Sequence, residues 1–150
     1  MTEVFDKYIA DIQTNLDAGN ATEHTHRPAL QALIESINGG VKATNEPQRI
    51  ACGAPDFIIE ENTCPIGFIE CKDIGASLNA AEKSEQLKKY LQSLTNFILT
   101  DYIEFRYYTV GELRRRASLG EIDADGKIRK SQEGVREVSN IINLFRKGRR

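Results

Sequence analysis

Two acids and one lysine stand near the middle of the chain at a spacing that could bring them together. Asp56 opens one apolar run, and Glu70 and Lys72 lie two residues apart in the next. Residues two apart in a strand point to the same face, so Glu70 and Lys72 would share a face. The 14 residues from Asp56 to Glu70 are enough for a hairpin that places the two carboxylates side by side.

Such a cluster is costly unless it binds something. Two neighbouring carboxylates repel and raise each other's pKa, and a hard divalent cation such as Mg²⁺ relieves the repulsion. The ion can then polarise a phosphodiester and lower the pKa of a bound water. Because an ordinary lysine pKa of about 10.4 makes a poor base at neutral pH, we expect Lys72 to orient the water or stabilise developing charge.

The elements around this cluster follow from hydrophobic periodicity. Apolar residues at helical spacing predict helices over residues 4–16, about 30–37 with Pro28 in the first turn, 79–94 with Asn79 as the cap, and 132–147. Strand-like runs occupy residues 56–60, 66–72, 97–100 and 103–108, with a further short strand around 49–52. The predicted fold is an α/β domain with a small central mixed sheet flanked by helices.

Length and composition suit one soluble domain over residues 1–150. The chain is 40% hydrophobic and 28% charged, and no run of about 18 apolar residues occurs. Its acidic start is unlike a secretory signal, so we expect a cytoplasmic protein. Three cysteines without CxxC spacing favour neither a disulfide framework nor a zinc ribbon. The net charge of −2 argues against nucleic-acid binding by bulk electrostatics, so any such affinity would have to come from a local surface or an attached part.

The residues Ala54-Pro55-Asp56 and Ile69-Glu70-Cys71-Lys72 resemble the PD-(D/E)xK nuclease motif. Gln86-Leu87-Lys88-Lys89-Tyr90 matches the QxxxY motif of one branch of that superfamily. The resemblance implies a restriction-endonuclease-like core that hydrolyses DNA with Mg²⁺, for which Mn²⁺ can substitute. It implies metal ligation by Asp56, Glu70 and the backbone carbonyl of Cys71.

The same resemblance extends to three further residues. Gln86 and Tyr90 would line the site and contact DNA or order the catalytic groups. Glu23 would be the upstream acid, on the early helical segment before Arg27, and would reach the metal directly or through water.

More narrowly, the segments 23–27, 53–57 and 99–105 are similar to the N-terminal nuclease domain of the type ISP restriction-modification enzymes. These enzymes join the nuclease to helicase-like translocase, methyltransferase and target-recognition domains in one polypeptide. This chain has neither a Walker motif nor a methyltransferase motif. The resemblance therefore implies the cleavage module of a larger protein, with DNA as its partner.

Other interpretations of the same residues stay open. The chain could be a free-standing repair or junction-resolving nuclease, or a catalytically silent nucleic-acid-binding module. Asp56, Glu70 and Lys72 could simply be solvated charges at a hairpin end. Two basic groups could contact phosphates or merely face solvent: Lys83, Lys88 and Lys89 in one, Arg114, Arg115 and Arg116 in the other.

Two further patterns are weak. His24 and His26 are alternate residues that would diverge on a helix, so a zinc site is not expected. The segment around Asp125-Gly126 predicts a plain hairpin turn rather than a calcium loop, because Gln132 stands where the closing glutamate would be.

Overall fold

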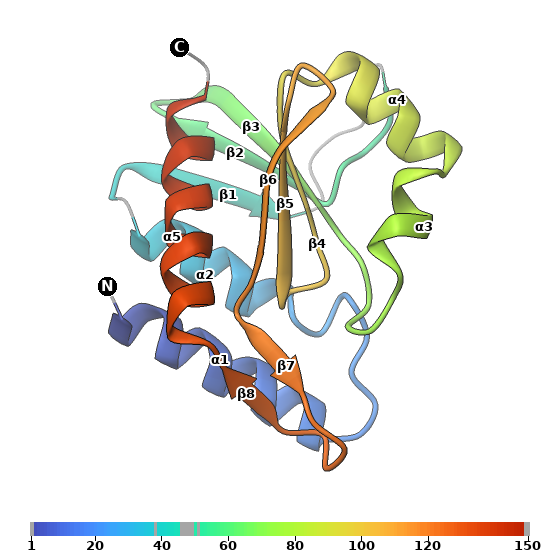
Figure 1. Ribbon diagram of the computed structural model, residues 1–150. Coiled ribbons are helices and arrows are strands. Elements are labelled where there is room, and N and C mark those ends of the chain that lie inside the picture. Colours follow the sequence, from blue (N-terminus) through green and yellow to red (C-terminus); the bar gives the residue numbers. More distant parts are fainter. Residues whose placement is uncertain (1, 38, 46–49, 51, 149–150) are drawn as a thin grey trace.

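The structure is a computed structural model, and it describes residues 2–37, 39–45, 50 and 52–148. A six-stranded sheet in the order β1-β2-β3-β4-β5-β6 forms its centre. The strands are β1 (Val41–Asn45), β2 (Phe57–Glu61), β3 (Cys64–Cys71), β4 (Asn96–Thr100), β5 (Glu104–Thr109) and β6 (Glu112–Ser118). The helices are α1 (Thr2–Asp17), α2 (Arg27–Ile37), α3 (Leu78–Glu82), α4 (Glu85–Ser93) and α5 (Gln132–Lys147) (Figure 1).

The sheet is mixed because one pair of neighbouring strands is parallel. β3 runs parallel to β4, and α3 and α4 make the connection between them; all other neighbours in this sheet are antiparallel. A parallel pair needs such a crossover, whereas β2 and β3 need only a short turn. The predicted fold class, an α/β domain with a small central mixed sheet flanked by helices, is confirmed.

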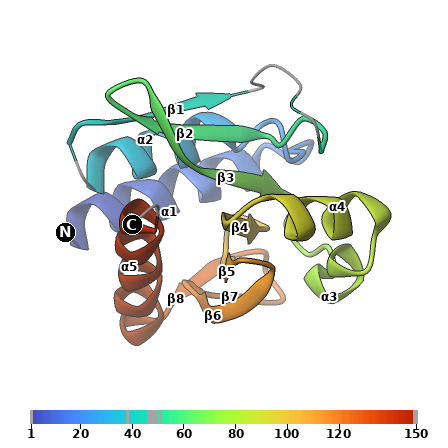
Figure 2. The same cartoon turned by 90° about the horizontal axis from the view of Figure 1, so that it is seen from above.

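Helices cover both faces of the sheet, as the view from above shows (Figure 2). The α1, α2 and α5 helices pack on one face over a large core that includes Phe5, Leu33, Ile98 and Phe145. On the opposite face, α3 and α4 pack over a smaller core. Its members are Leu78, Leu87, Tyr90, Leu94, Phe97, Leu99 and Tyr108. Alternate residues of β4 therefore point into different cores, as the pleat of a strand requires.

The predicted helix over residues 79–94 is wrong in one respect, since it is two helices. Ser77 caps α3, with its hydroxyl accepting from the Ala80 amide at 3.1 Å, and Ser84 caps α4 by accepting from the Leu87 amide at 3.2 Å. Serine side chains compete for backbone amides in this way and start a new helix. Asn79 therefore lies inside α3 and is not the cap. The other three predicted helices are confirmed to within a few residues.

The sequence pattern predicts neither of the two edge strands, β1 and β6. β1 buries only Ala43 and β6 only Ala117, so neither shows the alternation of a half-buried strand. The predicted short strand around residues 49–52 falls partly outside the described residues; within them, Ile50 and Gly53 form a single antiparallel bridge. The predicted strands 56–60, 66–72, 97–100 and 103–108 are present as β2 to β5 with ends shifted by one or two residues.

A small second sheet follows β6. β7 (Gly120–Ile122) and β8 (Ile128–Lys130) form an antiparallel hairpin, and its turn contains Asp125-Gly126, with Gly126 at φ +79°. The predicted hairpin turn is confirmed. The three cysteines are free thiols. Among the described residues, no helix combines the length and apolar character that crossing a membrane requires.

Candidate active site

The β2–β3 hairpin brings Asp56 and Glu70 together through reciprocal hydrogen bonds. The Asp56 amide donates to Oε1 of Glu70 at 3.1 Å, and the Cys71 amide donates to Oδ2 of Asp56 at 2.7 Å. Each acid is thus fixed by the backbone of the other strand. The register Phe57↔Ile69, which the hairpin sets, places Asp56 just before β2 level with Glu70 and Cys71.

Lys72 lies beside this pair, immediately after β3. Its Nζ is 3.7 Å from Oε2 of Glu70, and its side chain is about a quarter exposed (28%). Its amide donates to the Thr100 carbonyl at 2.8 Å, which continues the pairing of β3 with β4. The three residues whose meeting the sequence predicts are therefore in one cluster, with the amine on its solvent side.

Burial and charge act together on Glu70, which is only 6% exposed. Removal from water, and then the nearby charge of Asp56, raise the pKa of Glu70 to about 8, while Lys72 opposes the rise. At neutral pH this carboxyl group favours its protonated form, because burial and the neighbouring negative charge destabilise the carboxylate. A cation bound between the two acids would relieve that cost.

Glu23 lies near this cluster, but in a turn before α2 rather than on a helical segment. Two contacts hold the turn: the Glu23 amide donates to Oδ1 of Asp73 at 2.6 Å, and the Tyr102 hydroxyl donates to the Glu23 carbonyl. Burial, followed by the charge of Asp56, raises the pKa of Glu23. The expectation of an early helical segment at Glu23 is wrong, because the contacts with Asp73 and Tyr102 hold this residue in a turn.

Arg27 links the upstream acid to the hairpin and has no counterpart in the sequence-based assignment. Its guanidinium contacts Oδ1 of Asp56 through Nη2, and the same nitrogen is 3.9 Å from Oε1 of Glu23. Nη1 donates to Oδ1 of Asn45 at 3.2 Å. The side chain is 4% exposed. The only sequence signal for this role is its position four residues after Glu23, a spacing that would bring the two side chains together if both were helical.

Gln86 and Tyr90 form a unit on α4. Nε2 of Gln86 donates to the Tyr90 hydroxyl at 2.9 Å. The Tyr90 ring is fully buried against Phe97 and packs on Gly53, where an added Cβ would lie 3.1 Å from Cε1 of the ring. Gly53 also has φ +134°, so both its backbone conformation and the close approach of the Tyr90 ring favour glycine at this position. Tyr90 therefore packs against Gly53, in the segment that leads to Asp56.

The donor set of this cluster fits a hard divalent cation. Within the described residues, no group of three or more His, Cys, Asp or Glu side chains forms a ready-made metal cage. Magnesium sites of enzymes commonly use one or two carboxylates, completed by carbonyls, waters and substrate phosphates. Asp56 and Glu70 supply hard carboxylate oxygens, and one oxygen of each fixes the hairpin. Of the other two oxygens, Oδ1 of Asp56 contacts Arg27 and Oε2 of Glu70 lies 3.7 Å from Nζ of Lys72.

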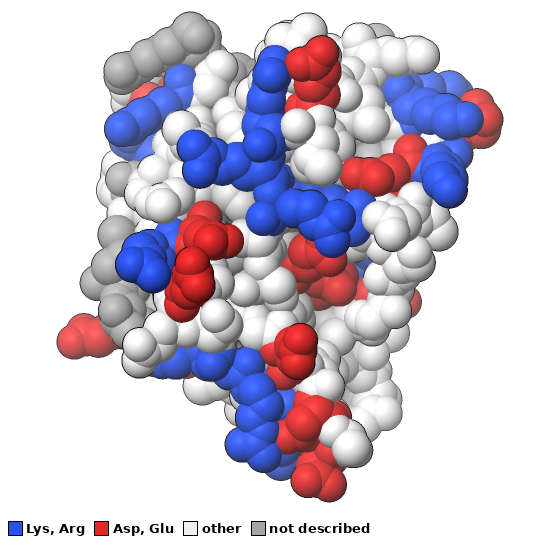
Figure 3. Space-filling model, viewed as in Figure 1, with Lys and Arg blue, Asp and Glu red and all other residues white. Residues whose placement is uncertain are grey.

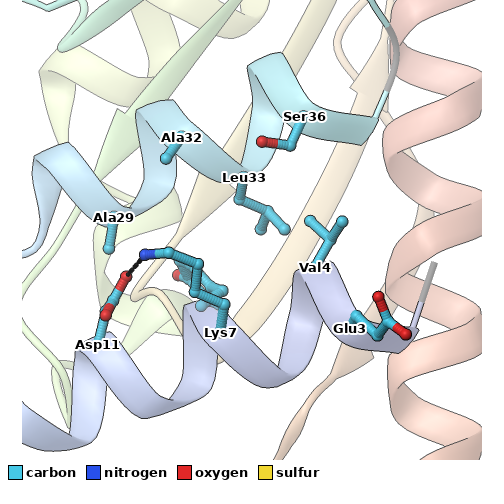
Figure 4. Close-up of a pocket in the computed structure, with 9 residues that line it drawn as sticks. Glu3, Val4, Lys7, Asp11, Ala29, Ala32, Leu33 and Ser36 are labelled. Atoms are coloured by element: carbon cyan, nitrogen blue, oxygen red, sulfur yellow. Dashed lines mark hydrogen bonds and ion pairs between the residues drawn. The ribbon is translucent and has the colours of Figure 1, made fainter.

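Other candidate positions do not join the cluster as ligands. His26 is buried against the Tyr102 ring at 5.1 Å, whereas His24 is largely exposed, so the two imidazoles diverge as expected. A hollow between α1 and α2 is lined by apolar groups such as Val4, Ala29 and Leu33, with the Lys7–Asp11 ion pair beside it (Figure 4). None of the residues that line this hollow is a predicted site residue.

The fold of this chain is similar to part of a solved structure. No protein-family model and no curated protein matches the sequence. Among solved structures, the chain is similar to a chain in a cryo-EM structure of a DrdV–DNA complex, with a TM-score of 0.75 and 19% sequence identity. The match covers 97% of this chain and 14% of that chain. Nearly the whole of this α/β unit thus has the fold of a segment of a much longer protein.

Proposed function

We propose that this chain is a divalent-metal-dependent DNA endonuclease domain. The observation that carries the proposal is the reciprocal fixing of Asp56 and Glu70 at the open end of the hairpin, with Lys72 alongside. The raised pKa of Glu70 also supports the proposal, because a bound cation would stabilise the carboxylate beside Asp56. Similarity of fold to part of a DrdV–DNA complex supports DNA as the substrate.

The candidate site residues divide into metal ligands and groups that act on water or on the ligands. Asp56, Glu70 and the Cys71 carbonyl would hold Mg²⁺ or Mn²⁺, and Glu23 would reach the ion directly or through water. When bound, the metal supplies Lewis acidity toward the phosphodiester and toward an attacking water. Lys72 faces solvent beside Glu70, so it can orient that water and stabilise charge at phosphorus. Arg27 holds the carboxylate of Asp56 in place.

We place this activity in a restriction-modification enzyme of the type ISP kind. The motif resemblance supports this context. Translocase, methyltransferase and target-recognition domains would then be attached and would deliver the DNA. A free-standing repair or junction-resolving nuclease is the second candidate, and it differs in that the isolated chain should cut branched DNA efficiently.

The test combines metal binding with cleavage. Calorimetry with Mg²⁺ and Mn²⁺ on the purified chain should show binding that Asp56→Asn abolishes and that Asp125→Asn, in the exposed β7–β8 turn, leaves unchanged. In a full-length protein, Asp56→Asn and Lys72→Ala should abolish DNA cleavage without loss of the fold. Full cleavage by either variant would refute the assignment. Absence of metal binding would favour a catalytically silent module.

A further inference from the structure

Arginine side chains gather on the edge of the sheet that is farthest from β1. β6 carries Arg114, Arg115 and Arg116 in succession, all exposed, and the last turns of α5 add Lys147 beside them. We call these four residues the basic edge. Figure 3 shows Lys and Arg over β6 and the adjoining end of α5, although the whole chain has a net charge of −2. Positive charge is therefore concentrated locally on this protein.

The arginines of the basic edge differ from those that hold the fold together. Arg106, on the neighbouring β5, is 4% exposed and is held by Glu82 at 3.2 Å and by Glu104 at 2.7 Å. Arg116 is 58% exposed and reaches Glu104 only at 3.5 Å. Among the residues that the structure describes, no carboxylate lies within ion-pair distance of Arg115. Arg115 and Arg116 are thus available to an external anion.

Arg115 pairs with Tyr107 and so points to the α5 face of the sheet, opposite to Arg116, where polar groups of α5 surround it. One hollow is lined by Arg115, Asn140, Asn143, Leu144 and Lys147, and a second lies between Arg115, Arg116 and Glu137. Guanidinium, ammonium and amide groups are those that most often contact DNA phosphates and sugars. Only Glu137 among these lining residues is acidic. The chemistry of the surface fits a phosphate backbone better than an apolar ligand.

Register across the sheet connects the basic edge with the candidate active site. Glu70 pairs with Leu99, Leu99 with Arg106, and Arg106 with Arg116, so the four residues form one row on the face covered by α3 and α4. Three strand spacings of about 4.8 Å separate Glu70 from Arg116 by roughly 14 Å. This is comparable to the width of the DNA major groove, about 12 Å. Leu99 and Arg106 are buried under α3 and α4, so a duplex would reach Glu70 and Arg116 from the end of the sheet, where β3 and β6 both finish.

We propose that the basic edge binds the DNA backbone and orients a duplex whose scissile phosphate lies at Asp56 and Glu70. This inference rests on the proposed nuclease function and names where the substrate is held. A second copy of the chain is a poorer occupant of the same edge. Pairing β6 with another β6 would set arginines against arginines, and like charges facing each other across strands are unfavourable.

The test is DNA binding measured without cleavage. Fluorescence anisotropy of a labelled duplex in EDTA, over a range of salt concentrations, compares the unmodified chain with the double variant Arg115→Gln/Arg116→Gln. We expect roughly tenfold weaker binding and a plot of log K against log salt that is shallower by about 1 to 2. The matched control is Lys127→Gln/Arg129→Gln, which removes the same charge from exposed residues already paired with Asp17 and Asp123.

The outcomes separate this inference from the nuclease proposal. Unchanged affinity and salt slope in the double variant, an equal loss in the control, or no binding by the unmodified chain would each overturn the inference. If Arg115→Gln/Arg116→Gln instead abolished a dimer seen by sedimentation, the edge would be a self-association surface and the inference would fail. Loss of binding in the double variant together with full cleavage by Asp56→Asn would keep the basic edge and refute the active-site assignment.

Discussion

The amide of Cys71 donates a 2.7 Å hydrogen bond to the Asp56 carboxylate, so one candidate metal ligand is held by the backbone beside the other. In turn, Oε1 of Glu70 accepts a hydrogen bond from the Asp56 amide at 3.1 Å. The same atoms therefore serve the hairpin and the candidate site. Substitutions of Asp56 should therefore separate its contribution to stability from its contribution to metal binding, depending on whether the new side chain can still accept the hydrogen bond from the Cys71 amide.

Asp56→Asn and Asp56→Ala should differ in stability but not in metal binding. Asparagine keeps an oxygen that can accept from Cys71, whereas alanine leaves that amide without this partner. We expect Asp56→Ala to be less stable than Asp56→Asn by about 1–3 kcal/mol in urea unfolding without metal. Both should lose Mg²⁺ binding in calorimetry. Equal stability of the two variants would show that the hydrogen bond contributes little.

The raised pKa of Glu70 should appear in the stability of the metal-free protein. Its folded-state pKa of about 8 lies above the ordinary value of 4.5, so the folded state keeps a proton that the unfolded chain releases between these values. The stability due to this proton is complete below about pH 4.5 and is lost as the pH rises through 8. Glu70→Gln should therefore gain stability over the unmodified chain, by a few kcal/mol, between about pH 6 and pH 9. Parallel pH curves would contradict this expectation.

Metal binding should show the opposite pH dependence. Mg²⁺ requires the carboxylate form of Glu70, so its affinity should rise with pH until about pH 8 and then level off. Below that pH, binding should release close to one proton. Calorimetry in two buffers with different ionisation heats measures this release directly. Binding that is independent of pH would exclude Glu70 as a ligand.

Arg27→Met should weaken the metal-free fold more than the metal-bound one. The substitution leaves the carboxylate of Asp56 without its guanidinium partner, and loss of one member of a buried pair costs about 3–5 kcal/mol. Added Mg²⁺ should restore part of that stability by supplying the missing positive charge. Arg146→Met, which breaks the 2.7 Å pair with Glu61, is the matched control. Its smaller loss should not respond to Mg²⁺; thermal unfolding with EDTA or Mg²⁺ measures both.

Tyr90→Phe tests whether the Gln86–Tyr90 pair acts on DNA or only on packing. Phenylalanine keeps the buried ring and removes the hydroxyl that accepts from Gln86 at 2.9 Å. We expect a stability loss of about 1 kcal/mol or less, and at least a tenfold loss of cleavage in both Tyr90→Phe and Gln86→Ala. Gln92→Ala, exposed on the same helix, should change neither property. Normal cleavage by both test variants would leave the pair a purely structural role.

Much of this protein can be deduced from local sequence. The α1, α2 and α5 helices and the strands β2 to β5 each bury an apolar face, and hydrophobic periodicity reports burial directly. The meeting of Asp56, Glu70 and Lys72 also follows, because the period of a strand and a short turn leave a hairpin little freedom. Local geometry alone dictated these features.

Tertiary structure decided the rest. β1 and β6 exist because the neighbouring strand offers backbone hydrogen bonds, and edge strands with solvated side chains leave almost no pattern in the sequence. The helix predicted as one breaks where Ser84 caps α4, and contacts of Glu82 with Arg106 and Tyr108 of β5 hold α3 on the sheet. Arg27 reaches Asp56 because α2 packs on β1, which pairs with β2 beside Asp56. Contacts between residues far apart in sequence depend on how whole elements pack, and no local pattern encodes that packing.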